Sequence, residues 1–277
     1  MSTPQTVGLG AVAGLTIFLG LPMGRVYTSG VKSKAFLNAV SAGILVFLLF
    51  DILAHATEPV ETAVQRAQQG QGSWVAFAGL AGVYAGGFGV GLIALLYAGR
   101  LWRRGRLSLG PGAMAVAEAD LPSPAQATAL RTGMSIAVGI GLHNFSEGLA
   151  IGQAARGGEL ALAGLLVVGF ALHNATEGFG IVGPLAAANV RAPWGWLALA
   201  GLVGGGPTFL GTLLGTRFTS TYVFVGFLAL AAGAILYVIG EILPVGRRLS
   251  WEVTLWGLFA GFVLGLATDL LLSAAGG

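Results

Sequence analysis

Long apolar stretches separated by short polar segments dominate the pattern of hydrophobic and polar positions along the chain. A membrane-spanning helix needs about 20 mostly apolar residues, and eight stretches meet this requirement. They are residues 7–24, 35–57, 74–98, 130–153, 159–186, 194–217, 221–244 and 252–274. The pattern therefore predicts an all-α membrane protein, with eight transmembrane helices in a single domain spanning residues 1–277.

The first stretch lies close to the N-terminus, where a secretory signal peptide could also stand. No basic segment precedes it, and no Ala-x-Ala cleavage pattern follows it. We therefore expect a retained helix.

Composition narrows the class of protein. Hydrophobic residues make up 55% of the chain and charged residues only 9%, against about 25% charged residues in a typical soluble domain. This excludes a soluble globular enzyme, a disordered chain and a partner of nucleic acid, although the formal net charge is +3. The 47 Gly fit membrane helices, in which small residues let backbones approach closely. Because there is no Cys, any metal must bind to His, carboxylate, amide or backbone groups.

The basic residues lie outside the apolar stretches or at their ends, and they orient the chain in the bilayer. One side holds eleven of the 14 Lys and Arg: Arg25, Lys32, Lys34, Arg100, Arg103, Arg104, Arg106, Arg131, Arg191, Arg247 and Arg248. The other side holds Arg66, Arg156 and Arg217. The positive-inside rule then places both termini outside and the long loop 99–129 in the cytoplasm. All six Trp fall at or near helix ends, as in an interfacial aromatic belt.

Two segments depart from the regular pattern. Loop 99–129 is rich in Arg at its start and then in Ala, Pro and Ser, which indicates a partly flexible linker. Residues 204–207 read Gly-Gly-Gly-Pro inside the sixth stretch, which predicts a kinked or a discontinuous helix.

Ionisable residues inside the apolar stretches are the chemically informative ones. They are all three His and five acidic residues: His55, His143, His173, Asp51, Glu147, Glu177, Glu241 and Asp269. Glu58 stands near a helix end. Such groups are costly in a bilayer and by default mark an ion path or site. Because the acidic groups lie inside and the basic groups outside, we expect a cation as the ligand.

An internal repeat places four of these residues in a common pattern. Residues Leu142–Gly148 and Leu172–Gly178 both read L-H-N-x-x-E-G, thirty residues apart. In a helix, the His and the Glu lie on one face, about one turn apart. Two such helices facing each other would bring two imidazoles and two carboxylates together, which is a plausible tetrahedral shell for Zn²⁺ or a similar ion.

The predicted metal ligands are His143, Glu147, His173 and Glu177. A single H-x-x-x-E pair could equally be a hydrogen-bonded helix contact, but two copies in adjacent helices favour a metal site. The two carboxylates would also neutralise a divalent ion, and an uncompensated buried charge is very costly.

The remaining ionisable residues inside or near the apolar stretches are less informative, and most of them allow two interpretations. Asp51, His55 and Glu58 share a helix face at i, i+4 and i+7, and form either an ion entrance or a polar helix contact. Glu241 precedes Pro244 near a helix end, where snorkelling or capping competes with a role in the ion path. Asp269 alone reads as a packing partner.

At the repeat, the sequence resembles the ZIP (Zrt-, Irt-like) family of divalent metal transporters, most closely its GufA-like bacterial branch. Family helix four carries H-N-x-P-E-G-L-A, and residues 143–150 match it with Ser146 in place of Pro. Family helix five carries a His or Gln, a polar neighbour and E-G, and residues 173–178 match it with Thr176 where Pro is common. The run 233–238 leading to Glu241 and Pro244 is also similar.

The resemblance implies eight helices, external termini and a long cytoplasmic loop between helices three and four. It also implies that Asn144 and Asn174 flank a second metal site, completed in the GufA-like branch by a Glu before a Pro on helix six. Here Gly206 stands before Pro207, so the second site lacks that ligand.

The function implied is transport of a divalent metal, zinc, toward the cytoplasm across a bacterial cytoplasmic (inner) membrane. The sequence does not rank Zn²⁺ against Cd²⁺, Fe²⁺, Mn²⁺, Co²⁺ or Ni²⁺ as substrate. The alternative is an intramembrane metal-dependent hydrolase, which would need an open metal position, whereas two His and two Glu close the shell. We expect no enzyme activity; the partners are the metal ion and the lipid bilayer, and a homodimer is left open.

Overall fold

The computed structural model describes residues 2–25, 30–104, 123–158, 160–217 and 220–274. In these ranges the chain forms helices joined by short connections, and no strand occurs. The helices are α1 (Thr3–Leu15), α2 (Ile17–Gly20), the 3₁₀ helix η1 (Leu21–Arg25), α3 (Val31–Gln68), α4 (Trp74–Arg104), α6 (Pro124–Arg156), α7 (Leu160–Ala187), α8 (Trp194–Gly215), α9 (Thr221–Leu249) and α10 (Trp251–Ala274). The predicted all-α fold class is confirmed.

Each of the eight predicted stretches coincides with a helix, the first with α1, α2 and η1 together. Within the described residues, seven of these spans are long and apolar enough to cross a membrane. The exception is α6, which has 33 residues but carries the polar run around His143 and Glu147. Its length suffices for a span, and it packs against α1, α7, α8 and α9.

The predicted loop 99–129 is too long at both ends. Helix α4 continues to Arg104, and α6 already begins at Pro124. A capping box explains this early start: Gln126 N–H donates to Ser123 Oγ at 3.2 Å, and Ser123 N–H donates to Gln126 Oε1 at 2.9 Å. Residues 105–122 lie outside the described part of the chain.

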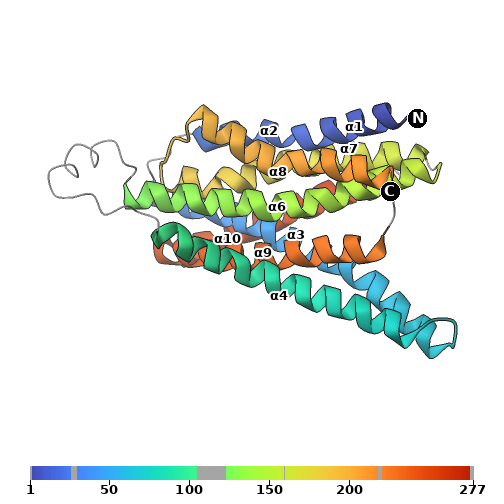
Figure 1. Cartoon of the computed structure of the whole chain (residues 1–277). Coiled ribbons are helices and arrows are strands. Elements are labelled where there is room, and N and C mark those ends of the chain that lie inside the picture. The colour runs from blue at the N-terminus through green and yellow to red at the C-terminus, as the bar shows by residue number, and fades with distance from the viewer. Residues whose placement is uncertain (1, 26–29, 105–122, 159, 218–219, 275–277) are drawn as a thin grey trace.

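Prolines did not mark the helix breaks. Helix α3 runs through Pro59 to Gln68, eleven residues beyond the predicted end at 57, and forms a hairpin with the start of α4 (Figure 1). Helix α8 is continuous through Pro207, so of the two alternatives predicted there, a kinked or a discontinuous helix, the second was wrong. The break instead lies in the first span, at Thr16 between α1 and α2.

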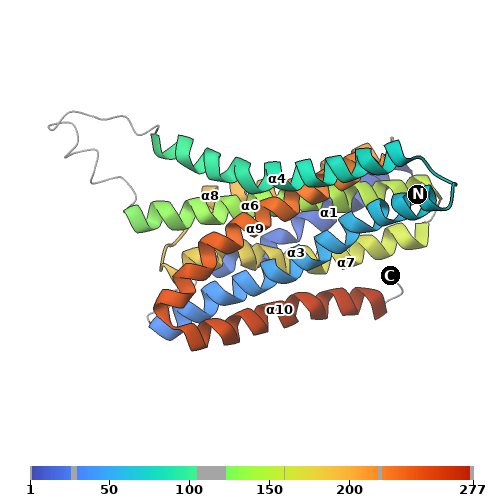
Figure 2. The ribbon, with the colours of Figure 1, turned by 90° about the horizontal axis from the view of Figure 1, so that it is seen from below.

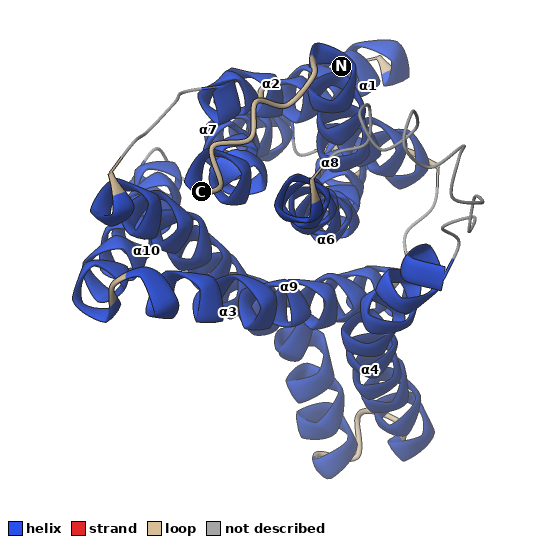
Figure 3. Cartoon of the chain, turned by 90° about the vertical axis from the view of Figure 1, so that its left-hand side faces the viewer, coloured by secondary structure: helices blue, strands red, loops and turns tan. Residues whose placement is uncertain are grey.

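The helices form two groups. Figure 3 shows α1, α2, α6, α7 and α8 on one side, and α3, α4, α9 and α10 on the other. Within the groups, α6 packs extensively on α8, α3 on α10, and α4 on α9. Glycine permits several of these contacts, because a Cβ at Gly148 or Gly211 would collide with the backbone of the facing helix.

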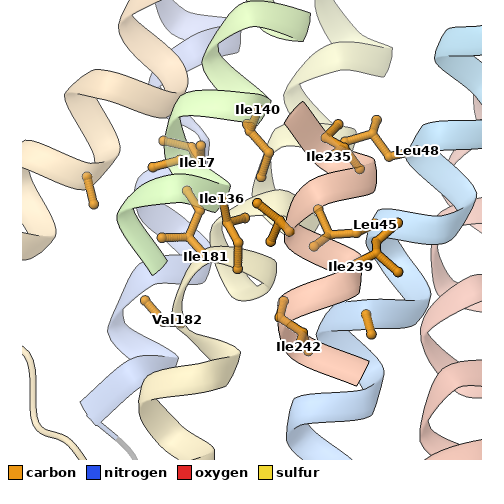
Figure 4. Packing of buried hydrophobic residues seen from close by; sticks show 14 of the residues in the cluster. Ile17, Leu45, Leu48, Ile136, Ile140, Ile181, Val182, Ile235, Ile239 and Ile242 are labelled. Atoms are coloured by element: carbon orange, nitrogen blue, oxygen red, sulfur yellow. The ribbon is translucent and has the colours of Figure 1, made fainter. Parts of the chain in front are cut away.

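Branched aliphatic side chains fill the space between the two groups (Figure 4). Ile136 and Ile140 of α6 and Ile181 of α7 meet Leu45 of α3 and Ile239 of α9 in one buried cluster. The predicted metal residues of α6 and α7 lie on helices that contribute to this core.

The start of α1 and the end of α10 lie at one end of the bundle, and the end of α4 and the start of α6 at the other (Figures 1 and 2). Trp74, Trp194 and Trp251 are the first residues of α4, α8 and α10, and their side chains are exposed. The Arg25 guanidinium lies 4.7 Å from the Trp194 ring centroid and donates to Ala192 O at 2.6 Å. This placement is the one expected for an interfacial belt.

Candidate metal centre

The two copies of the repeat lie on α6 and α7, which pack against each other. His143 and Glu147 of α6 and Glu177 of α7 are buried, with Glu177 completely inaccessible. A carboxylate shut away from water needs a compensating partner. Because α6 packs on α7, the buried carboxyl groups of Glu147 and Glu177 come from two neighbouring helices and interact with each other.

Contacts within and between the two helices join these residues. His143 Nε2 lies 3.2 Å from Glu147 Oε1, as the i, i+4 spacing predicts. Asn144 Nδ2 donates to Glu177 Oε2 at 3.1 Å and so links α6 to α7. Glu177 also interacts electrostatically with Glu147 and His143. Three of the four predicted ligands thus belong to one buried network.

The fourth predicted ligand, His173, has its backbone in α7, but its side chain lies outside the described part of the structure. Among the side chains that are described, no three His, Asp or Glu come together closely enough to hold a metal ion. The complete set of four ligands therefore remains a prediction.

Both asparagines of the repeat are anchored through their amide nitrogens. Besides its bond to Glu177, Asn144 Nδ2 donates to Gly204 O of α8 at 3.0 Å. Asn174 Nδ2 donates to Ala13 O of α1 at 3.0 Å. Both side chains are completely buried, and their Oδ1 atoms have no hydrogen-bond partner among the described atoms. Each amide is thus held by its nitrogen, and its buried oxygen is an acceptor without a hydrogen-bond donor among the described atoms.

The sequence did not single out the carbonyl anchors or the hydroxyls of Thr16 and Thr208, and it marked Ser146 only as the residue that replaces a family Pro. Thr208 of α8 and Ser146 of α6 are buried, and their hydroxyl oxygens have no hydrogen-bond partner in the described structure. Thr16 occupies the α1–α2 break. For Thr16 and Thr208 the available signal was a hydroxyl residue inside an apolar stretch, but their apolar neighbours made both positions resemble ordinary helix.

Asp51 and His55 of α3 form a pair of their own. His55 Nδ1 lies 3.4 Å from Asp51 Oδ1, and it lies 2.9 Å from Asp51 O. The Asp51 side chain is 22% exposed and that of His55 is 59% exposed. Asp51 interacts electrostatically with His143 and Glu177, and His55 interacts with His143 and with Asp269 of α10. The pair flanks the buried network on the side of α3.

The two remaining candidates lie elsewhere. Glu58 lines a cleft of about 570 Å³ between the α3–α4 hairpin and the start of α9, together with Arg66 and Tyr222. The described contact between Asp51 and His55 does not include Glu58, although the three residues share a helix face. Glu241 is exposed on α9.

The position of Gly206 bears on the number of metals. A Cβ added to Gly206 would meet no atom within 4 Å, and none of the described contacts of Asn144 or Asn174 involves this residue. Helix α8 contributes Gly204 O and Thr208 to this region, neither of which carries charge.

Together, the long apolar helices and the buried acid–imidazole–amide network are features of a multi-pass membrane protein with ionisable groups inside its bundle. Residues 116–268 match the family model of the ZIP zinc transporters, which is 153 of the 277 residues. The chain belongs to this family, as the repeat had indicated. No curated protein matches it in sequence.

Members of the ZIP family transport divalent metal cations and are transporters rather than enzymes. The chain is thus an integral, multi-pass membrane protein of a divalent-metal transporter family. The GufA-like branch stays a prediction.

Proposed function

We propose that the protein transports zinc toward the cytoplasm through a site formed by His143, Glu147, His173 and Glu177. The observation that carries the proposal is the buried network in which the His143–Glu147 pair of α6 is tied to Glu177 of α7 through Asn144. The distribution of Arg and Lys, together with the resemblance, favours a bacterial cytoplasmic membrane with both termini outside.

The donor set supports zinc as the substrate. Two imidazole nitrogens and two carboxylate oxygens suit a borderline ion that accepts tetrahedral coordination. The two carboxylates contribute −2 and the ion +2, so the loaded site is neutral in a part of the protein that excludes water. Cd²⁺, Fe²⁺, Mn²⁺, Co²⁺ and Ni²⁺ carry the same charge, and selectivity among them depends on geometry.

Metal flux into liposomes tests the function. Purified protein reconstituted into vesicles should admit Zn²⁺ to an encapsulated metal-sensitive dye, and the same vesicles should be challenged with the other five ions. Reconstituted vesicles without metal flux would contradict the proposal. Zinc-dependent hydrolysis of a lipid or peptide would favour an intramembrane hydrolase instead.

Metal binding should weaken as pH falls. The carboxylates and imidazoles coordinate a metal only in their deprotonated forms, so protons compete with the ion for the same atoms. For each proton displaced, the apparent affinity can change by up to about tenfold per pH unit. We expect a steady rise in the zinc dissociation constant from about pH 7.5 to about pH 5.5, measured by titration calorimetry in detergent. A flat profile would show that the ligands are not these titratable groups.

One tightly bound metal per chain is the expected stoichiometry. Two dications would bring +4 to two glutamates that carry −2, and the amides Asn144 and Asn174 add oxygen ligands without charge. The acid that the family resemblance places on helix six is replaced by Gly206. Elemental analysis after gel filtration should therefore give about one zinc per chain, because an uncompensated buried charge is costly.

Gly206→Glu supplies the missing carboxylate, and the space around Gly206 accommodates a side chain. This variant should retain more zinc than the wild type, whereas Gly206→Gln, of the same shape without the charge, should not. Two tightly held metals in the wild type would show that the charge argument is wrong.

A further inference from the structure

The break in the first membrane span lies directly on α7 next to the proposed site. Helix α1 ends at Leu15 and α2 begins at Ile17, with Thr16 between them (Figure 1). A Cβ added to Gly178 of α7 would collide with Ile17 O, and one added to Gly20 of α2 would collide with Ala175 O. The two backbones are thus in direct contact over the turn that carries Asn174 and Glu177.

The Thr16 hydroxyl lies between two carbonyls at this contact. Its Oγ1 is 2.7 Å from Ala13 O of α1 and 2.6 Å from Ala171 O of α7. A hydroxyl has one hydrogen, so it can donate to only one of the two carbonyls at a time. When it donates to Ala171 O, it links the end of α1 to α7, one turn before Asn174.

Ala13 O is also the acceptor for the Asn174 amide. Asn174 Nδ2 donates to it at 3.0 Å, and the side chain is completely buried. The nitrogen and oxygen of an amide point in different directions from the same carbon, so fixing the nitrogen on α1 turns Oδ1 away from α1. That Oδ1 has no hydrogen-bond partner among the described atoms, and only an oxygen, not an NH₂ group, can coordinate a metal.

We infer that Thr16 is a positioning residue for the metal site. Its hydroxyl donates to Ala171 O and so ties the end of α1 to α7, the Ala13 carbonyl on that end fixes the Asn174 amide, and the Asn174 oxygen is thereby oriented as a neutral ligand flanking the four proposed ones. The inference rests on the proposed site between α6 and α7. It assigns to the α1–α2 break a function that neither the repeat nor the family match includes.

Substitutions that remove the Thr16 hydroxyl test the inference through zinc affinity in detergent. Thr16→Val keeps the shape of the side chain and should weaken zinc binding by about tenfold, which is the lower end of the cost of losing a group that orients a ligand. Thr16→Ser keeps the hydroxyl and should restore wild-type affinity. Thr16→Ala serves the same purpose as the valine variant if the latter does not fold.

Thr268→Val is the matched control. Thr268 Oγ1 donates to Gly265 O at 2.7 Å within α10, so this variant loses a hydroxyl bonded to its own helix but touches no part of the site. Its zinc affinity should equal that of the wild type. Equal zinc affinities of Thr16→Val, Thr268→Val and the wild type would overturn the inference.

A double-mutant cycle shows whether Thr16 acts through Asn174. In an Asn174→Ala background, Thr16→Val should cause no further loss of affinity, because the amide to be oriented is gone. Additive losses would overturn the inference even if both single variants bind weakly. The proposed site is tested separately by Glu147→Ala. If this variant binds zinc normally, the site itself is wrong. If Glu147→Ala no longer binds zinc but the losses in the double-mutant cycle are additive, only the role of Thr16 is rejected.

Discussion

Glu177→Ala should abolish metal transport. Glu177 is completely buried and accepts a hydrogen bond from Asn144, so its carboxylate is one of two charges proposed to neutralise the ion. Removing one partner of a buried charge pair costs about 3–5 kcal/mol. Since about 1.4 kcal/mol corresponds to a factor of ten, uptake of Zn²⁺ into vesicles should fall by at least about a hundredfold. His143→Ala removes a neutral ligand and should reduce uptake less completely.

Glu252→Ala is the control for Glu177→Ala. Glu252 is an exposed acid in the first turn of α10, and its loss changes the net charge equally. This variant should transport zinc like the wild type. Near-normal uptake by Glu177→Ala would exclude this carboxylate as a metal ligand.

Gly205→Ala should be strongly destabilising, whereas Gly206→Ala should not. A Cβ at Gly205 would collide with Gly14 O of α1, because the backbones of α1 and α8 touch there. Overpacking of this kind costs about 1–3 kcal/mol, and more where only backbone can move. A Cβ at Gly206 meets no atom within 4 Å, and Ala is favoured over Gly in a helix by up to about 1 kcal/mol.

Thermal unfolding in detergent, followed by Trp fluorescence, compares the two neighbouring variants. The melting temperature should fall for Gly205→Ala and stay equal or rise for Gly206→Ala. A similar melting temperature for both would mean that α1 and α8 are not in backbone contact at this point.

The hydrophobic pattern predicted the spans because a bilayer demands long apolar helices whatever their neighbours. It did not predict helix limits that depend on neighbours. Helix α3 continues past Pro59 because its polar end packs against the start of α4, and the capping box at Ser123 starts α6 early. Residues 204–207 looked like a helix break, yet α8 is continuous there and the break occurs at Thr16.

The candidate site was predictable to the extent that its residues repeat. Helical spacing alone explains the His143–Glu147 contact, and the thirty-residue offset identified Asn144 and Glu177 as members of neighbouring helices. The anchors at Gly204 O and Ala13 O are backbone atoms of distant segments, and no side-chain pattern reports them. The shared helix face grouped Glu58 with Asp51 and His55 in the prediction, whereas in the structure Glu58 lines a cleft with Arg66 and Tyr222.

Anomalous diffraction at the zinc edge from crystals of the zinc-loaded protein tests the central claim most directly. The account predicts one strong peak between α6 and α7, about 2.0–2.2 Å from nitrogens of His143 and His173 and from oxygens of Glu147 and Glu177. A single strong peak at the Asp51–His55 pair, with none between α6 and α7, would contradict it.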